Sequence, residues 1–179
     1  MLAKLLKPTW FCESIYDINP DTLLYNNIKT IFFDLDNTLI PYNEELPFES
    51  TKKFINYLEE KGLNIYVISN NHLERVEKFS NDLGCKFSYM SYKPLKFKLN
   101  KFIKKENLKK EEIIIVGDQL LTDIFCSKRL KIRSVLVTPA CSEDLVQTKI
   151  NRFFDNIIRR KQLKKGYLIN FERSDYCNE

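Results

Sequence analysis

Short apolar runs alternate with segments of helical periodicity from residue 30 onward, and this alternation is typical of a parallel β-sheet with crossover helices. Each apolar run is short enough to be one buried strand. The predicted strands cover residues 30–33, 64–68, 86–89, 113–116 and 134–137. The pattern therefore predicts an α/β fold with a Rossmann-like, doubly wound parallel sheet.

Four amphipathic segments between these strands predict the crossover helices. They cover residues 50–61, 73–83, 95–105 and 121–130. Ser50 suits the N-cap of the first helix, and Gly62 and Gly84 suit the positions just past the ends of the first two.

Two flanking segments extend this core, and we divide the chain into residues 1–28, 29–140 and 141–179. The first contains Trp10 and Phe11 and is too apolar for a free tail, so we expect it to pack on the outside of the core. The last predicts a basic amphipathic helix. Its apolar face contains Val146, Ile150, Phe153, Phe154, Ile157 and Ile158, and its basic face contains Lys149, Arg152, Arg159 and Arg160. We expect the apolar face either to cover the sheet or to contact a membrane surface.

The composition is that of a globular protein, with 44% hydrophobic and 30% charged residues. No apolar run approaches the roughly 20 residues of a membrane-spanning helix, and Pro8 interrupts the apolar start, so we expect a cytoplasmic protein. The formal net charge of +5 is compatible with an anionic partner, either the inner face of the membrane or nucleic acid. The five cysteines form no Cys-x-x-Cys pair, which argues against a zinc cluster and a disulfide framework.

Two aspartates, Asp34 and Asp36, directly follow the first predicted strand. Residues i and i+2 of a strand share a face, so both carboxylates can reach one ion or phosphate at the carboxyl edge of the sheet. Two crowded carboxylates are unfavourable unless a cation neutralises them. The pair therefore predicts a divalent metal.

The other strand ends also carry groups suited to phosphate chemistry. Ser69 and Asn70 follow the second strand, Lys93 precedes the third helix, and Asp118 and Asp123 follow the fourth strand. We expect these groups to meet Asp34 at one edge of the sheet, with the Asn70 amide at a helix start where anions bind.

Two further residues are alternatives to this set. Lys96, three residues after Lys93, competes with it for the same role. We interpret His72 as an exposed residue at the start of a helix rather than as a catalyst.

Together these motifs resemble the four ordered motifs of the haloacid dehalogenase (HAD) superfamily. The matching stretches are DLDNTL (34–39), SNN (69–71), KPL (93–95) and GDQLLTD (117–123). They look most like the YqeG family of subclass IIIA phosphatases, and the flanks at 14–18 and 148–152 extend the resemblance over nearly the whole chain. One departure is the stretch FCSKR at 125–129, where a glycine-rich segment is expected; it affects packing more than chemistry.

The resemblance implies a Mg²⁺-dependent phosphatase. Asp34 would attack phosphorus to form an aspartyl-phosphate, while Asp36 would protonate the leaving oxygen and then activate water. The implied phosphate-binding residues are Thr38, which would also orient its loop, Ser69, Asn70 and Lys93. The implied metal ligands are Asp34, Asp36 through its carbonyl oxygen, Asp118 and Asp123, the last either from outside the shell or through Lys93.

The intervals between the motifs are filled by the predicted helices and strands, so the sequence leaves no room for an inserted cap domain. A capless site indicates a large phosphorylated substrate or a partner that closes the pocket. The resemblance adds phosphatidylglycerophosphate, whose head group lies at a membrane surface. The alternatives are a nucleotide or nucleic-acid end phosphatase, and a non-catalytic module that binds RNA or ribosomes. The filled catalytic positions argue against that module, and the oligomeric state is not predicted.

Overall fold

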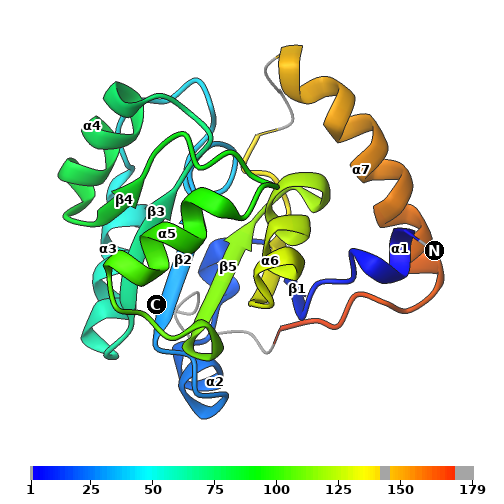
Figure 1. The fold of residues 1–179 in the computed structure, drawn as a ribbon, viewed down its shortest axis with the longest axis horizontal. Helices are drawn as coiled ribbons and strands as arrows, with labels where there is room; N and C mark the ends of the chain where they lie inside the picture. Colours follow the sequence, from blue (N-terminus) through cyan, green and yellow to red (C-terminus); the bar gives the residue numbers. More distant parts are fainter. Residues whose placement is uncertain (1, 142–145, 172–179) are drawn as a thin grey trace.

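Six parallel strands form one sheet in the order β1-β6-β5-β2-β3-β4 (Figure 1). The structure is a computed structural model that describes residues 2–141 and 146–171, without the side chains of 146–150. The strands are β1 (Trp10–Cys12), β2 (Thr30–Asp34), β3 (Asn64–Ile68), β4 (Lys86–Ser88), β5 (Ile113–Gly117) and β6 (Arg133–Val137). This is the predicted Rossmann-like α/β architecture, and no domain is inserted between its strands.

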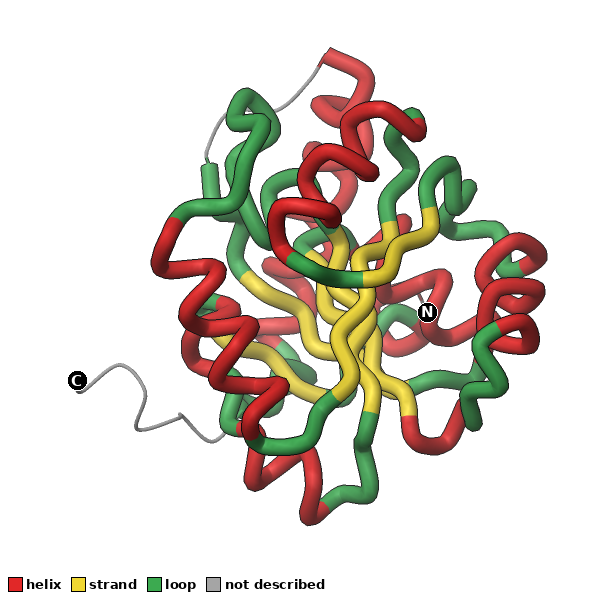
Figure 2. The backbone as a smooth tube through the Cα atoms, turned by 90° about the vertical axis from the view of Figure 1, so that its left-hand side faces the viewer, coloured by secondary structure: helices red, strands yellow, loops and turns green. Residues whose placement is uncertain are grey.

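Helices cover both faces of the sheet (Figure 2). The longer helices are α3 (Glu49–Glu60), α4 (Leu73–Leu83), α5 (Phe97–Lys105) and α7 (Val146–Lys164). The shorter ones are α1 (Leu2–Leu5), α2 (Pro20–Tyr25), α6 (Phe125–Leu130), the 3₁₀-helices η1 (Ile15–Asp17) and η2 (Lys110–Glu112), and the π-helix η3 (Leu120–Ile124). Among the described residues, none of these helices is both long and apolar enough to cross a membrane.

The core lies in two layers because successive strand residues point to opposite faces. Phe33 packs with Phe54 of α3 and Phe79 of α4 on one side of the sheet, and Phe32 packs with Leu99 of α5 on the other. All five residues of β2 are buried, which explains why this strand reads as an uninterrupted apolar run up to Asp34.

The register of the central strands brings their carboxyl ends together. β2 lies between β3 and β5, and Thr30 is level with Asn64 on one side and Ile113 on the other. The three parallel strands therefore end at the same edge, where open α/β sheets bind their ligands.

All five predicted strands are present, each with its ends within one residue of the prediction. The helix boundaries were less accurate. Ser50 is not the N-cap of α3, because the helix begins at Glu49 and the Ser50 hydroxyl instead hydrogen-bonds the Tyr16 hydroxyl at 3.1 Å. The predicted helix at 121–130 is divided into η3 and α6, and the helix expected from residue 95 begins at Phe97.

The sequence prediction missed β1, which pairs with β6 at the edge of the sheet. Trp10 is level with Val135. The outer edge of β1 is itself occupied, since the Phe11 amide donates to the Ile169 carbonyl and the Phe171 amide donates to the Phe11 carbonyl. Three residues are too few for an alternating pattern to be recognised, so this strand can be identified only from its pairing with β6.

Of the two alternatives for the C-terminal helix, the one in which its apolar face covers the sheet is wrong for most of that face. Its supposed inward face is largely exposed: Phe153 is 63% exposed, Phe154 51% and Ile157 37%. Of the described members of that face, Ile158 alone is buried, and the other buried side chains of the helix are the polar Asp155 and Gln162. Three members of the predicted pattern, Val146, Lys149 and Ile150, lie outside the side chains that the structure describes.

Polar partners on the neighbouring elements explain this orientation. The Gln162 amide donates to the carbonyl oxygens of Ala3 at 3.0 Å and Leu6 at 2.9 Å, which joins α7 to α1. The Asp155 carboxylate accepts from the amides of Leu120 at 2.9 Å and Leu121 at 3.1 Å. These hydrogen bonds from Gln162 Nε2 and to the Asp155 carboxylate allow polar side chains to be buried, whereas hydrophobic periodicity assumes an apolar buried face.

Adjacent isoleucines on α7 test this orientation. Ile158→Ala is expected to lower the free energy of unfolding by about 2–5 kcal/mol, because the side chain is buried in an apolar cluster with Leu6 and Leu136. Ile157→Ala, the matched control, should lower it by less than about 1 kcal/mol. Chemical denaturation of both variants measures the two losses, and a larger loss for Ile157→Ala would contradict the orientation.

Candidate active site

Three buried carboxylates meet at the carboxyl edge of the central strands. Asp34 is the last residue of β2, Asp118 follows β5 directly, and Asp123 lies in η3. One carboxylate oxygen from each residue lies within 4.8 Å of the others. Asp118 and Asp123 are fully buried, and Asp34 is 7% exposed. The sequence predicted that these three carboxylates would converge together with that of Asp36, and the structure brings the three together without Asp36.

Lys93 lies between two of these carboxylates. Its ammonium is 2.5 Å from Asp34 Oδ1 and 2.6 Å from Asp123 Oδ1, and its side chain is 2% exposed. Burial alone would lower the pKa of Lys93, but the carboxylates of Asp123 and Asp34 outweigh it and raise the pKa above its ordinary value. Lys93 is therefore held as an ammonium, while Lys96, the competing candidate, is exposed.

The side chain of Asn70 fixes the backbone of Lys93. Its amide nitrogen donates to the Lys93 carbonyl at 2.9 Å, and its oxygen accepts from the Lys93 amide at 2.7 Å. Asn70 was predicted to bind phosphate through its main chain; its side chain positions the lysine.

The positive groups only partly compensate the three carboxylates. Burial raises the pKa of Asp34, and the charge of Lys93 opposes this rise. Burial likewise raises the pKa of Asp118, and the guanidinium of Arg152 opposes it. Raised pKa values in a carboxylate cluster show that more positive charge would be favourable there, as a bound cation would supply.

Two further features fix the position of Asp118 and Asp123. The Thr38 hydroxyl donates to Asp118 Oδ1 at 3.2 Å, so Thr38 connects the loop after β2 to the carboxylate after β5. Asp123 packs directly over Gly117, where a Cβ atom would lie 2.4 Å from Asp123 Cγ. Only glycine fits at the end of β5 without displacing Asp123.

Asp36 lies apart from the carboxylate cluster. Its Oδ1 accepts a hydrogen bond from Arg75 Nε at 2.8 Å and lies 2.6 Å from Arg75 Nη2, and its Oδ2 accepts from Asn71 Nδ2 at 3.3 Å. The Asp36 carboxylate is therefore directed toward the start of α4. It still faces the same cavity as Asp34.

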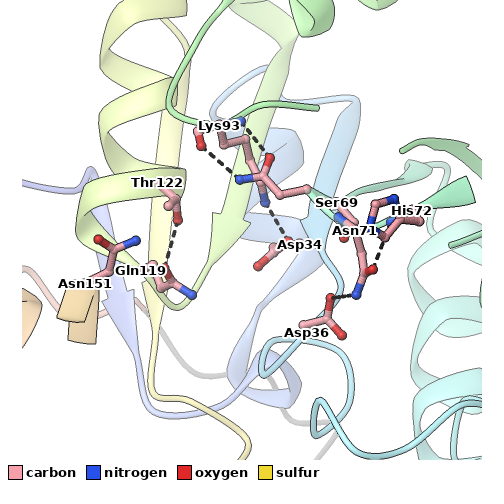
Figure 3. A pocket seen from close by; sticks show the side chains of 10 residues that line it. Asp34, Asp36, Ser69, Asn71, His72, Lys93, Gln119, Thr122 and Asn151 are labelled. Carbon is pink, nitrogen blue, oxygen red and sulfur yellow. Dashed lines mark hydrogen bonds and ion pairs between the residues drawn. The ribbon is translucent and has the colours of Figure 1, made fainter. Parts of the chain in front are cut away.

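The cavity has a volume of about 320 Å³. Figure 3 shows Asp34 and Lys93 between two groups of lining residues, with Asn151, Gln119 and Thr122 on one side and Asp36, Ser69, Asn71 and His72 on the other. The Ser69 hydroxyl accepts from the Asn71 amide at 3.0 Å. His72 is exposed and is the N-cap residue of α4, where the sequence placed it.

Several residues of the site were not predicted from the sequence. Arg75 lies in the first turn of α4, four residues after Asn71 of the SNN motif, and this short spacing could have indicated that it belongs to the site. Arg152 was assigned to a basic outer face, but its Nη2 lies 2.5 Å from Asp118 Oδ2 and its side chain is only 14% exposed. Burial raises the pKa of Asp155, on the same face of α7, to about 6 even though two amides donate to it.

Sequence comparison identifies the class of protein that this fold and site define. Residues 43–137, more than half of the chain, match the family model described as haloacid dehalogenase-like hydrolase. The chain therefore belongs to the haloacid dehalogenase-like hydrolases. The matched segment contains Ser69, Lys93, Asp118 and Asp123, whereas Asp34 and Asp36 precede it.

Within this family the chain is similar to the protein named "Probable phosphatase YqeG" from Bacillus subtilis (strain 168). The two are 34% identical over 168 residues, which cover 94% of this chain and 98% of the relative. The predicted membership of the YqeG family of HAD phosphatases is thereby confirmed.

Solved structures with low sequence identity share the fold. An uncharacterized protein from Listeria monocytogenes serotype 4b is 14% identical, with 66% of this chain and 85% of that chain covered and a TM-score of 0.53. The cobalt-bound deoxy-D-mannose-octulosonate 8-phosphate phosphatase from Haemophilus influenzae is 16% identical, with coverage of 78% and 91% and a TM-score of 0.50. These similarities support the fold alone.

Proposed function

We propose that this HAD phosphatase hydrolyses phosphomonoesters with bound Mg²⁺, through an aspartyl-phosphate formed on Asp34. One observation carries the proposal: Asp34 faces the cavity, Lys93 holds its Oδ1 at 2.5 Å, and two further carboxylates lie within 4.8 Å. A nucleophilic carboxylate requires this kind of charge compensation before it can approach an anionic phosphate.

The donor set fits a hard divalent cation. Asp34, Asp118 and Asp123 offer only oxygen atoms, which Mg²⁺ prefers, and their separation is short enough for a single ion. Asp34 and Asp118 would hold the ion directly with the Asp36 carbonyl, and Asp123 would support the site through its ion pair with Lys93. When bound, Mg²⁺ would offset the repulsion between the Asp34 carboxylate and the substrate phosphate.

The first half-reaction transfers the phosphoryl group to Asp34. A carboxylate oxygen of Asp34 forms a bond to phosphorus while the bond from phosphorus to the leaving oxygen breaks. Lys93 and the Ser69 hydroxyl, which both line the cavity, stabilise the charge on the phosphoryl oxygens. Asp36 supplies the proton that the leaving alcohol takes up.

The second half-reaction returns Asp34 to its free form. Asp36 accepts a proton from a water molecule, the water oxygen attacks phosphorus, and the bond between phosphorus and the Asp34 oxygen breaks. Inorganic phosphate is the product. Arg75 and Asn71 keep the Asp36 carboxylate at the cavity wall for both steps.

Replacing the nucleophile tests this proposal. Asp34→Asn should reduce the release of phosphate from p-nitrophenyl phosphate to the background rate, because an amide cannot form the acyl phosphate. Asp21→Asn is the matched control, since its side chain is 70% exposed in α2 and its activity should equal that of the wild type. Circular dichroism should be the same for all three proteins, and chelation with EDTA should abolish wild-type activity until Mg²⁺ is restored. Full activity of a folded Asp34→Asn variant would refute the mechanism.

We propose phosphatidylglycerophosphate as the substrate, with the head group presented at a membrane surface. The outer face of α7 supports this choice. Phe153 and Phe154 are exposed, and Arg160, Lys161 and Lys164 are exposed farther along the helix. Aromatic side chains followed by cations match the surface of an anionic bilayer. Asn151, three residues before Phe154 on the same helix, lines the cavity, so a membrane bound by this face of α7 would lie near the active site.

A substrate panel tests the lipid proposal. Turnover of phosphatidylglycerophosphate in anionic vesicles should exceed that of sugar phosphates, nucleotides and a 5′-phosphorylated oligonucleotide. The double variant Phe153→Ser/Phe154→Ser should lower turnover in vesicles at least about tenfold, because two apolar side chains no longer enter the bilayer. Hydrolysis of soluble p-nitrophenyl phosphate by this variant is the control and should not change. Equal turnover of a soluble metabolite or of the oligonucleotide would exclude the lipid as the preferred substrate.

A further inference from the structure

The inner face of α7 contacts the segment that carries Asp118. Asp155 accepts hydrogen bonds from the first two amides of η3. Arg159 Nη2 donates to the carbonyl oxygens of Asp118 at 3.2 Å and Val137 at 3.0 Å. Arg152 reaches the Asp118 carboxylate itself. These three residues share one face of the helix, so α7 binds the turn after β5 along two of its own turns.

Arg152 holds Asp118 at two points. Its Nη2 donates to Asp118 Oδ2 at 2.5 Å, and its Nη1 donates to the Asp118 carbonyl oxygen at 3.4 Å. The Thr38 hydroxyl holds the other carboxylate oxygen, Oδ1. A planar guanidinium that contacts both ends of one residue fixes its orientation, which a single hydrogen bond cannot do. The direction of the Asp118 carboxylate is therefore set by Arg152 of α7 together with Thr38.

We infer that α7 completes the metal site of this capless enzyme, and that Arg152 is the positioning residue for Asp118. The inference rests on the proposed function, because it assigns Asp118 to the cation. The helices and strands between the motifs provide no inserted domain over the site. The C-terminal helix instead contributes Asn151 to the cavity wall and Arg152 to the carboxylate cluster.

Arg152 also carries a positive charge, and charge and geometry have opposite consequences for metal binding. A cation next to the site repels a second cation, so removal of the charge would tighten metal binding. Loss of a residue that orients a metal ligand weakens metal binding. Arg152→Lys separates the two effects, because lysine keeps the charge but its single ammonium does not reproduce the planar two-point contact.

Binding of Mn²⁺ to the substrate-free protein, measured by electron paramagnetic resonance, tests the inference. Arg152→Lys should raise the Kd for Mn²⁺ about 10- to 100-fold. Arg160→Lys is the matched control, since Arg160 is exposed on the same helix, and it should leave the Kd unchanged. At saturating metal, Arg152→Lys should leave the KM for p-nitrophenyl phosphate near the wild-type value, because Arg152 contacts a metal ligand and not the substrate.

Chemical rescue provides a second variant in case Arg152→Lys does not fold. Arg152→Ala should also bind Mn²⁺ weakly, and millimolar guanidinium should restore part of the lost affinity, whereas ammonium should not. A Kd for Arg152→Lys equal to that of the wild type, or a Kd for Arg152→Ala that guanidinium lowers no more than ammonium does, would overturn the positioning role. If the wild type binds no Mn²⁺, the proposed metal-dependent function fails as well, so the two failures are distinguishable.

Discussion

The ion pairs of Lys93 with Asp34 and Asp123 are the interaction on which the rest of the site depends. Burying three carboxylates within 4.8 Å of one another is strongly unfavourable unless positive charge lies among them. Lys93 supplies that charge from the loop before α5, at 2.5 and 2.6 Å. The negative charge that Lys93 leaves uncompensated makes the cluster suitable for a divalent cation, and hence for phosphate chemistry.

The fold brings these charges together from distant parts of the chain. Parallel pairing of β2 with β3 and β5 aligns three strand ends, and the close packing of Gly117 against Asp123 lets η3 turn back over the edge. Asn70 then fixes the backbone of Lys93 through two hydrogen bonds. The strand pairings and the Asn70–Lys93 hydrogen bonds join segments far apart in sequence, so the site forms only when the sheet is complete.

Most of the sheet and of the acidic site could be predicted from the sequence, because buried strands and strand-end carboxylates leave local patterns. β1 could not, since its three residues form a strand only by pairing with β6. The expectation that the apolar face of α7 covers the sheet was mostly wrong, because Asp155 and Gln162 are buried with hydrogen-bond partners on other elements, which periodicity along one helix cannot reveal. Arg75 and Arg152 were missed for the same reason: each pairs with an aspartate distant in the chain.

The stability of Lys93→Met, measured without divalent cations at neutral pH, tests the central claim most directly. Removing one partner of a buried ion pair leaves uncompensated carboxylates, so the free energy of unfolding should fall by about 3–5 kcal/mol relative to the wild type. Lys96→Met removes the same charge from an exposed position three residues away and should have little effect. Equal stabilities of the two variants would contradict the account, because the carboxylate cluster would then not depend on the ammonium of Lys93.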